Sequence, residues 1–168
     1  MANLHVRIDD RLIHGQIVTA WAKSLNIKRV IAIDDDIANN EMVQGIMLMG
    51  IPKDYRPQVV TLETAIKILS EQLDSKNILL ITRFAKNLRT IKDYIKTAQE
   101  VNIGNCSKQS DSVYISKGIG VGQVLSFSQA DVDVLDELHN EGIKVIFQQM
   151  PSDKVIDWPT LKQTLKAN

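Results

Sequence analysis

The sequence has little of what disulfide-rich, membrane-spanning and nucleic-acid-binding proteins require. Its 168 residues include one cysteine, Cys106, which excludes an internal disulfide framework and is typical of a reducing compartment such as the cytosol. No apolar run approaches the roughly 20 residues that span a bilayer, and the N-terminus lacks the basic and apolar regions of a signal peptide. Twenty basic residues balance twenty acidic ones, so the net charge favours neither nucleic acid nor an anionic membrane as a partner.

Histidine is also scarce. The three histidines are His5, His14 and His139. None has metal-ligand spacing to another histidine or to Cys106, so we expect no zinc site. Cys106 has no basic neighbour that would activate its thiol, and we interpret it as non-catalytic.

Two sequence features suggest ligands only weakly. The glycine-rich run at residues 118–122 (GIGVG) differs from the G-x-G-x-x-G pattern and ends well before the next predicted helix, which favours a surface turn. There is no Walker A sequence. The acidic run Asp34–Asp36 follows a predicted strand and would suit Mg²⁺, but such carboxylates more often cap a helix or face solvent.

Short β-branched runs alternate with helical patterns along most of the chain, and this alternation predicts the fold. Strands are expected at residues 5–8, 29–34, 57–62, 77–82, 101–104, 112–116 (a short edge strand) and 143–147. Helices are expected from residue 14 to about residue 25 and at residues 38–49, 63–73, 85–97 and 128–140. This order predicts a single α/β domain over residues 1–168, with an open, mostly parallel sheet and helices on both faces.

Helical spacing also predicts which side chains face the core. In residues 38–49, Met42, Ile46 and Met49 recur every three or four residues and are expected to point inward. In residues 85–97, Leu88, Ile91 and Ile95 share one face in the same way.

The most informative segment is Arg7–Gln16 (RIDDRLIHGQ), a charged turn between a predicted strand and a predicted helix. His14 falls at or just before the first helical turn, where unpaired amides and the positive end of the helix dipole favour anions. Arg11 and His14 in one such turn are suited to holding a phosphoryl group. A capped loop with an ordinary surface histidine fits the same spacing.

The position of this turn in the predicted sheet favours a ligand site. Parallel sheets bind ligands beyond the carboxyl ends of their strands, so Asp9–His14, Asp34–Asp36, Thr82–Arg83 and Gly104–Asn105 are expected at one edge. An imidazole must be unprotonated to attack phosphorus, and a helix N-terminus disfavours the cation. Asp9 or Asp10 would orient the imidazole or Arg11 by hydrogen bonding.

Residues Arg7–Gln16 resemble the IIB component of the mannose/fructose/sorbose family of the bacterial phosphotransferase system. Residues 29–38 (RVIAIDDDIA) are similar to the family's second strand and acidic turn, and Val101–Gly104 to its V-N-[VI]-G segment. Gly142–Ile143 and Pro151–Asp153 also match family positions. The resemblance covers essentially the whole domain.

The resemblance implies a mechanism and a set of partners. His14 would accept a phosphoryl group on Nδ1 from a phosphohistidine of a IIA protein or domain and pass it to a sugar. The sugar would enter through the membrane components IIC and IID, which places the chain in the cytoplasm at the inner membrane face. Arg11 would help to hold the phosphoryl group, Asp9 would be a nearby loop carboxylate, and neither a metal nor an organic cofactor is implied.

The resemblance leaves the sugar open among mannose, fructose, sorbose and amino sugars. The chain departs from the family pattern at Asn105-Cys106-Ser107 and at Thr82-Arg83-Phe84. The roles of Asp10, Asp34, Asp35, Thr82 and Asn105 stay open, as does homo-oligomerisation. Leu12 and Ile13 are expected either to contact partner proteins or to pack in the core.

Two alternative functions remain at this point. Asp9-Asp10 after the first strand mimics the acidic pair of a receiver-like phosphorelay module. That alternative needs an acceptor aspartate after the third strand, where the chain has Thr61-Leu62-Glu63. A nucleotide-binding α/β domain would have to use residues 118–122, whose spacing is unsuitable.

Overall fold

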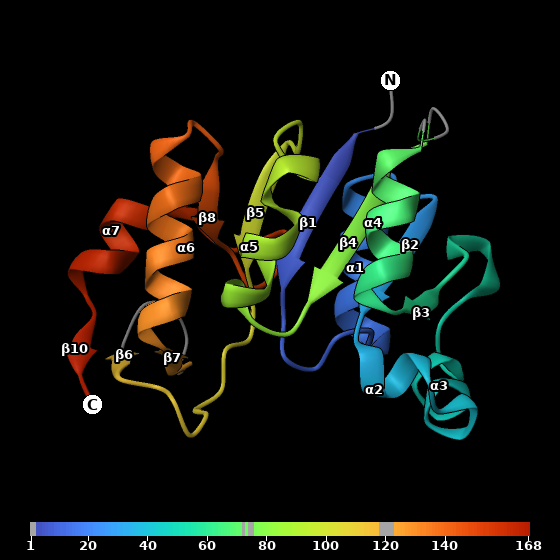
Figure 1. Cartoon of the computed structure of the whole chain (residues 1–168), viewed down its shortest axis with the longest axis horizontal. Coiled ribbons are helices and arrows are strands. Elements are labelled where there is room, and N and C mark those ends of the chain that lie inside the picture. Colours follow the sequence, from blue (N-terminus) through green and yellow to red (C-terminus); the bar gives the residue numbers. More distant parts are fainter. Residues whose placement is uncertain (1–2, 72, 74–75, 118–122) are drawn as a thin grey trace.

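A seven-stranded sheet forms the centre of the computed structural model, which describes residues 3–71, 73, 76–117 and 123–168 (Figure 1). Its strands, in spatial order, are β3 (Gln58–Val60), β2 (Arg29–Ile33), β4 (Ile78–Thr82), β1 (Leu4–Ile8), β5 (Glu100–Ile103), β8 (Val145–Phe147) and β9 (Ile156–Asp157). All neighbouring pairs are parallel except β8 and β9. The predicted open, mostly parallel sheet is confirmed.

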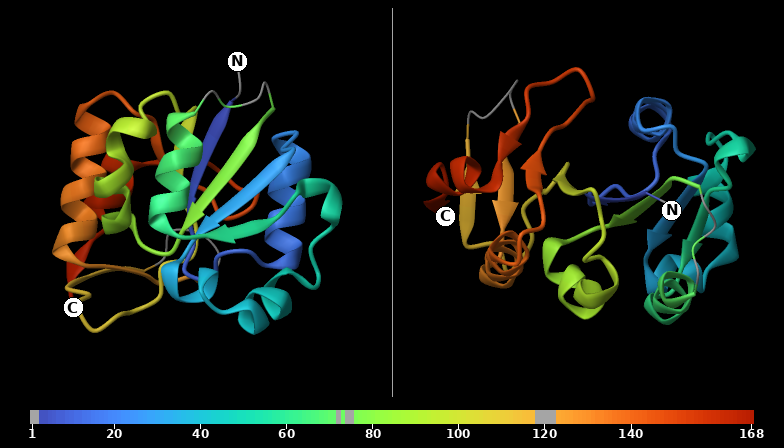
Figure 2. Two further views of the ribbon diagram at one scale, coloured as in Figure 1. Left: turned by 45° about the vertical axis from the view of Figure 1, so that its right-hand side comes forward. Right: turned by 90° about the horizontal axis from the view of Figure 1, so that it is seen from above.

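Helices cover both faces of this sheet, as predicted (Figure 2). Helix α1 (Gly15–Ser24) lies on one face, and α4 (Leu62–Ser70), α5 (Leu88–Ile91) and α6 (Gln129–Asn140) lie on the other. Because side chains alternate along a strand, each central strand contributes to two cores. In β4, Leu79 and Ile81 pack with Trp21 of α1, whereas Ile78 and Leu80 pack beneath α4, α5 and α6.

The helices that follow β1 and its neighbour β4 lie on opposite faces of the sheet. The chain leaves β1 through α1 on one face, while β4, its neighbour in the sheet, is followed by α5 on the other. Connections that diverge in this way open a ligand-binding crevice at the carboxyl end of the sheet. The predicted turn at Arg7–Gln16 therefore lies at a topological switch point.

The C-terminal third contains a second, antiparallel sheet with the order β10 (Lys166–Ala167), β6 (Tyr114–Ser116) and β7 (Leu125–Phe127). The edge strand predicted at residues 112–116 is thus the central strand of this small sheet. Strands β7, β9 and β10 and helix α7 (Trp158–Gln163) were not predicted, because segments of two to six residues show no clear periodicity. Trp158 of α7 is buried edge-to-face against Phe127.

The helix predicted at residues 38–49 is wrong in two respects. It consists of α2 (Asp35–Ala38) and α3 (Glu41–Leu48), and Asn40 caps the second by accepting a hydrogen bond from the Val43 amide. Met42, Ile46 and Met49 are exposed rather than inward-facing. Helical spacing shows that these residues share a face, but only packing decides whether that face meets the core.

The helix predicted at residues 85–97 is also interrupted. Helix α5 is flanked by 3₁₀ turns η2 (Ala85–Asn87) and η3 (Lys92–Tyr94). Tertiary hydrogen bonds replace helical ones at the start of the segment, since the Lys86 amide donates to Asp131 and the Asn87 side chain donates to Thr82 Oγ1. Leu88, Ile91 and Ile95 are nevertheless buried, as predicted.

Within residues 3–71, 73, 76–117 and 123–168, every helix is too short or too polar to cross a bilayer.

Candidate functional site

His14 stands at the start of α1, where the sequence predicts it. Its backbone is extended (φ −145°, ψ 145°), and the first hydrogen bond of the helix runs from Val18 N to His14 O at 3.0 Å. The amides before Val18 therefore have no partner within the helix. The imidazole is partly accessible, with 24% of the side chain exposed. A partner can thus reach a ring that sits beside free helical amides.

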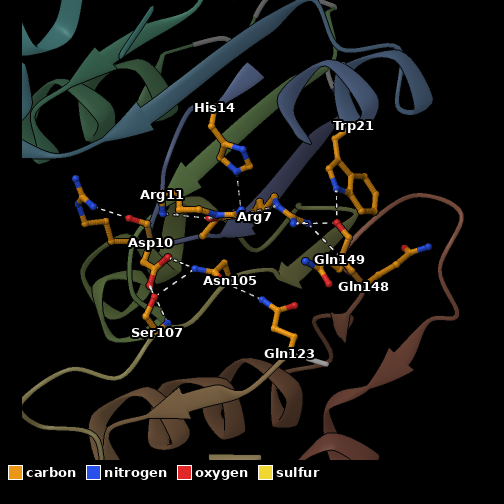
Figure 3. Close-up of polar contacts among 12 residues, drawn as sticks. Arg7, Asp10, Arg11, His14, Trp21, Asn105, Ser107, Gln123, Gln148 and Gln149 are labelled. Atoms are coloured by element: carbon orange, nitrogen blue, oxygen red, sulfur yellow. Dashed lines mark hydrogen bonds and ion pairs between the residues drawn. The ribbon is translucent and has the colours of Figure 1, made fainter. Parts of the chain in front are cut away.

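Asp9 is the centre of the turn, and its carboxylate is buried (1% exposed). His14 Nε2 lies 3.4 Å from Asp9 Oδ2. Arg11 donates to Asp9 Oδ1 twice, from its backbone N at 3.1 Å and from Nε at 3.2 Å (Figure 3). The structure thus brings together Asp9, Arg11 and His14, the three site residues named from the sequence.

The backbone between these residues is tightly bent. Leu12 N donates to Asp9 O at 2.9 Å, and Leu12 itself has a φ of +56°. A leucine in this left-handed region costs about 1 kcal/mol. Its buried side chain, packed in the core shared with α1, offsets that cost. The turn that presents His14 is therefore held in place by packing.

Asp9 remains ionised in this environment. Burial alone raises the pKa of Asp9, but the hydrogen bonds from His14 and Arg11 and the charge of Arg7 lower that pKa to about 2. A carboxylate facing Nε2 favours the tautomer that carries its proton on Nε2. That assignment leaves the lone pair of the ring on Nδ1.

Sequence reasoning missed Arg7, which is 2% exposed and lies behind Asp9. Its Nη1 and Nη2 donate to the carbonyls of Gln148 (3.2 Å) and Gln149 (3.1 Å), and its Nε is 3.5 Å from Asp9 Oδ2. The guanidinium stacks 5.1 Å from the ring centre of Trp21. Burial lowers the pKa of Arg7, and the charge of Asp9 opposes that effect. An arginine in a mostly apolar strand was the available signal.

Gly104 makes room for this arginine. A Cβ at Gly104 would lie 2.6 Å from Arg7 Nη2 and 2.9 Å from Ile8 O. Any side chain at this position would push the guanidinium off its carbonyl partners. The glycine of the V-N-I-G segment is therefore required by a close approach of side chain to backbone.

Asp10 does not orient the imidazole. Its carboxylate accepts hydrogen bonds from the Asn105 side-chain amide and from both the amide (2.7 Å) and hydroxyl of Ser107. Gln123 Nε2 in turn donates to Asn105 Oδ1 at 2.8 Å (Figure 3). The residues at which the chain departs from the family pattern thus hold the outer side of the turn.

The acidic run after β2 caps and braces local structure. Asp34 Oδ1 accepts from Ile37 N at 2.9 Å at the start of α2, and Asp34 Oδ2 pairs with Arg83 Nε at 2.7 Å. Asp35 Oδ1 accepts from Leu62 N at 2.7 Å. In the part of the chain that the structure describes, no three histidine, cysteine or acidic residues are grouped so that they could hold a metal ion.

The remaining candidates do not join the site. Cys106 is buried, which raises the pKa of its thiol and disfavours the reactive thiolate. His5 lies in β1 and His139 near the end of α6. Leu12 and Ile13 are both buried, so core packing accounts for them. Residues 118–122, interpreted from sequence as a surface turn, lie outside the described residues.

Relatives of known sequence resemble the chain over most of its length. It is 28% identical over 153 residues to a fructose-specific EIIB component of Bacillus subtilis, covering 90% of each chain. The sorbose-specific EIIB component of Klebsiella pneumoniae is also 28% identical, with 90% of this chain and 89% of that protein covered. The mannose-specific EIIAB component of Escherichia coli is 24% identical over 149 residues, which span 88% of this chain and 44% of that protein.

Solved structures and a family description agree with these relatives. The IIB domain of the sorbose permease from Klebsiella pneumoniae superposes with a TM-score of 0.82 at 25% identity, covering 98% of both chains. The manxB structure from Thermoanaerobacter tengcongensis gives 0.80 at 28% identity, covering 97% of this chain and 96% of that one. The family described as "PTS system sorbose subfamily IIB component" matches residues 4–168. The chain therefore belongs to the sorbose subfamily of phosphotransferase-system IIB components.

Proposed function

We propose that this IIB component accepts a phosphoryl group on Nδ1 of His14 from a phosphorylated IIA protein and transfers it to a sugar. The contact between His14 Nε2 and the ionised carboxylate of Asp9 carries the proposal, because it leaves Nδ1 as the nucleophile. In the first transfer the donor's P–N bond breaks as the His14 P–N bond forms. In the second a sugar hydroxyl attacks phosphorus, and the imidazole leaves.

The groups around His14 suit the charged intermediate. Arg11, 44% exposed, shares the carboxylate of Asp9 with His14 and lies where its guanidinium can hold phosphoryl oxygens. The free amides at the start of α1 add partial positive charge on the same side of the turn. Arg7 stays behind Asp9 and does not face the phosphoryl group.

Relatives support the class of partner and sugar. One relative from Escherichia coli is named a mannose-specific EIIAB component, in which a IIA and a IIB component share one protein. Other relatives are named for fructose, sorbose and N-acetylgalactosamine. We therefore propose a hexose or amino sugar as the final acceptor. We also propose that residues 1–168 form one IIB domain. This domain would lie in the cytoplasm and dock on the membrane components IIC and IID.

The proposal is tested by the chemistry of the labelled protein. Incubation with a IIA protein carrying ³²P-phosphohistidine is expected to label this chain on one residue. A phosphoramidate bond is labile in acid and stable in alkali. Peptide mapping by mass spectrometry should place the label on His14. An acid-stable label, as on serine or tyrosine, or a label on another peptide would contradict the proposal.

Arg11→Ala is expected to slow phosphoryl transfer. A charge-assisted hydrogen bond contributes about 1.5–3 kcal/mol, so the rate should fall roughly 10- to 100-fold. The transfer rate of Arg11→Lys should lie between those of the wild type and Arg11→Ala, because lysine keeps the charge but lacks the planar guanidinium. Single-turnover transfer from phospho-IIA, followed by rapid quench, measures both.

Arg89→Ala is the matched control, since Arg89 is a half-exposed arginine paired with Glu137 on α5 and α6. Its transfer rate should stay at the wild-type value. Equal rates for Arg11→Ala and the wild type would remove Arg11 from the site.

The alternatives from the sequence find less support. Asp9 pairs with Arg7 and Arg11 while Asp10 binds Asn105 and Ser107, so the two carboxylates do not form the metal-binding pair of a receiver module. The nucleotide-binding alternative depends on residues 118–122, and the chain's family is one of IIB components.

A further inference from the structure

Helix α3 carries a row of large apolar side chains that face solvent. Met42, Ile46 and Met49 stand at helical spacing and are 76%, 65% and 81% exposed, and Val43 beside them is 38% exposed. We call these four residues the α3 stripe. They are half of the eight large apolar side chains that are exposed in the described part of the chain. No residue of α3 is fully buried.

The helix is held by contacts that leave this face free. Asn40 caps its first turn, and Gln44 Nε2 donates to Ala38 O. Met47 and Leu48 pack, partly buried, against the core shared with α1. A contiguous apolar surface that a soluble domain leaves exposed is typical of a protein interface.

The stripe lies beside the His14 turn. Gly50, directly after Met49, places its carbonyl oxygen 4.0 Å from the position of a Cβ on Gly15. Figure 1 shows α2 and α3 beyond the arrowheads of β1 and β4, at the edge of the sheet where the His14 turn also lies. One partner can therefore contact the stripe and the imidazole together.

The His14 turn itself offers little apolar contact. Leu12 and Ile13, the two apolar residues next to His14, are 1% and 2% exposed. A protein that docks on the turn alone would meet mainly Arg11, Asp10 and the rim of the ring. Even transient complexes bury several hundred Å² on each side, with an apolar centre. The stripe supplies that centre.

We infer that the α3 stripe is the docking surface for the protein that phosphorylates His14. The inference rests on the proposed function. Charge supports this occupant. Met49 lines a hollow of about 460 Å³ together with Lys53 and Arg56. The phosphoryl group of the donor is anionic and gains from these cations.

A lipid surface fits the stripe less well. Exposed acidic residues, Asp35, Asp36 and Glu41, precede and begin α3, and they would face anionic headgroups. Interfacial membrane helices place basic residues along their polar face, and α3 has none within its eight residues. A protein partner with an apolar face that presents its anionic group at the Lys53 and Arg56 end of the stripe matches this separation of charge.

The test is a triple variant, Met42→Gln, Ile46→Gln and Met49→Gln, assayed with phospho-IIA as the donor. The KM for phospho-IIA is expected to rise at least tenfold, while kcat stays within twofold because the His14 turn is untouched. Circular dichroism and urea unfolding should match the wild type, since all three side chains are exposed. The control is Val113→Gln with Val155→Gln, two apolar residues outside α3 that are 44% and 46% exposed; the KM of this double variant should not change.

Lys53→Glu provides a second test that removes no apolar surface. It should raise the KM for phospho-IIA and weaken the dependence of KM on salt. If both the triple variant and Lys53→Glu keep the wild-type KM, the docking assignment is wrong even though His14 is labelled. If the wild type is not labelled on His14, the proposed function and the docking assignment fall together.

Two further measurements distinguish the phosphoryl donor from the membrane complex and from a lipid surface as the partner of the α3 stripe. The triple variant, once phosphorylated, should transfer to sugar through IIC and IID vesicles at the wild-type rate. A loss confined to that step would assign the stripe to the membrane complex and overturn the inference. Co-sedimentation of the wild type, but not of the triple variant, with phosphatidylglycerol vesicles would make the stripe a lipid surface and overturn it as well.

Discussion

His14→Ala will abolish phosphorylation by phospho-IIA and, with it, sugar phosphorylation. The substitution removes the proposed nucleophile, and no other histidine in the described structure contacts Asp9. The fold should persist because the His14 side chain makes no capping hydrogen bond and is partly exposed, so unfolding free energy should change by less than about 1 kcal/mol. Autoradiography after incubation with ³²P-labelled donor, together with urea unfolding, measures both effects.

His139→Gln is the matched control for this experiment. His139 is an exposed histidine near the end of α6. The His139→Gln variant should be labelled at the wild-type rate. Labelling of His14→Ala at an appreciable rate would show that another residue accepts the phosphoryl group.

Asp9→Asn will reduce both the transfer rate and the stability. The amide cannot carry the charge that orients His14 Nε2 and pairs with Arg11, so the rate should fall roughly 10- to 100-fold. The substitution also leaves the buried charge of Arg7 uncompensated. Breaking such a pair costs about 3 kcal/mol or more, which urea unfolding at pH 7 would report. A variant with wild-type stability and rate would contradict the central role of Asp9.

The pH dependence of the wild type provides an independent measure of Asp9. Its folded-state pKa of about 2 lies below the unfolded value of about 3.9, so ionisation favours the folded state. The stabilisation, about 2 kcal/mol, is present above pH 4 or so and is lost as the pH falls towards 2. The difference in unfolding free energy between the wild type and Asp9→Asn should therefore shrink over that range.

Asp10→Asn separates the effect of Asp9 from a general loss of charge in the turn. Asp10 is the next residue, but its carboxylate binds Asn105 and Ser107 rather than His14 or Arg11. We expect a smaller fall in transfer rate than for Asp9→Asn.

Local sequence signals predicted the parts of the fold that depend on short-range pattern. The run Ile78–Ile81 is apolar throughout, which is typical of a strand buried on both faces, and β4 is the strand between β1 and β2. The helix predicted at residues 128–140 was correct, and Ser128 and Asp131 form a capping box at its start. The position of His14 at the start of α1 followed in the same way.

Long-range packing decided what these signals could not. Met42, Ile46 and Met49 have the spacing of a buried face, but α3 turns that face outward. Residues 85–97 have a helical pattern, but hydrogen bonds to Thr82 and Asp131 draw the first turn into a 3₁₀ conformation. Periodicity reports which residues share a face, and only tertiary contacts determine what that face meets.

The sequence by itself determined the fold class, the positions of the main strands along the chain, and the charged turn that contains Asp9, Arg11 and His14. These depend on neighbours within about ten residues along the chain. Only the tertiary structure decided that Asp9 rather than Asp10 faces the imidazole, and that Arg7 anchors Asp9 against the carbonyls of residues 148 and 149. The Arg7 hydrogen bonds join residues 141 and 142 positions apart. They also require that Gly104 leaves space for the guanidinium and that Trp21 stacks on it. Local sequence patterns do not predict these contacts, because burial and close approach arise only when distant elements pack together.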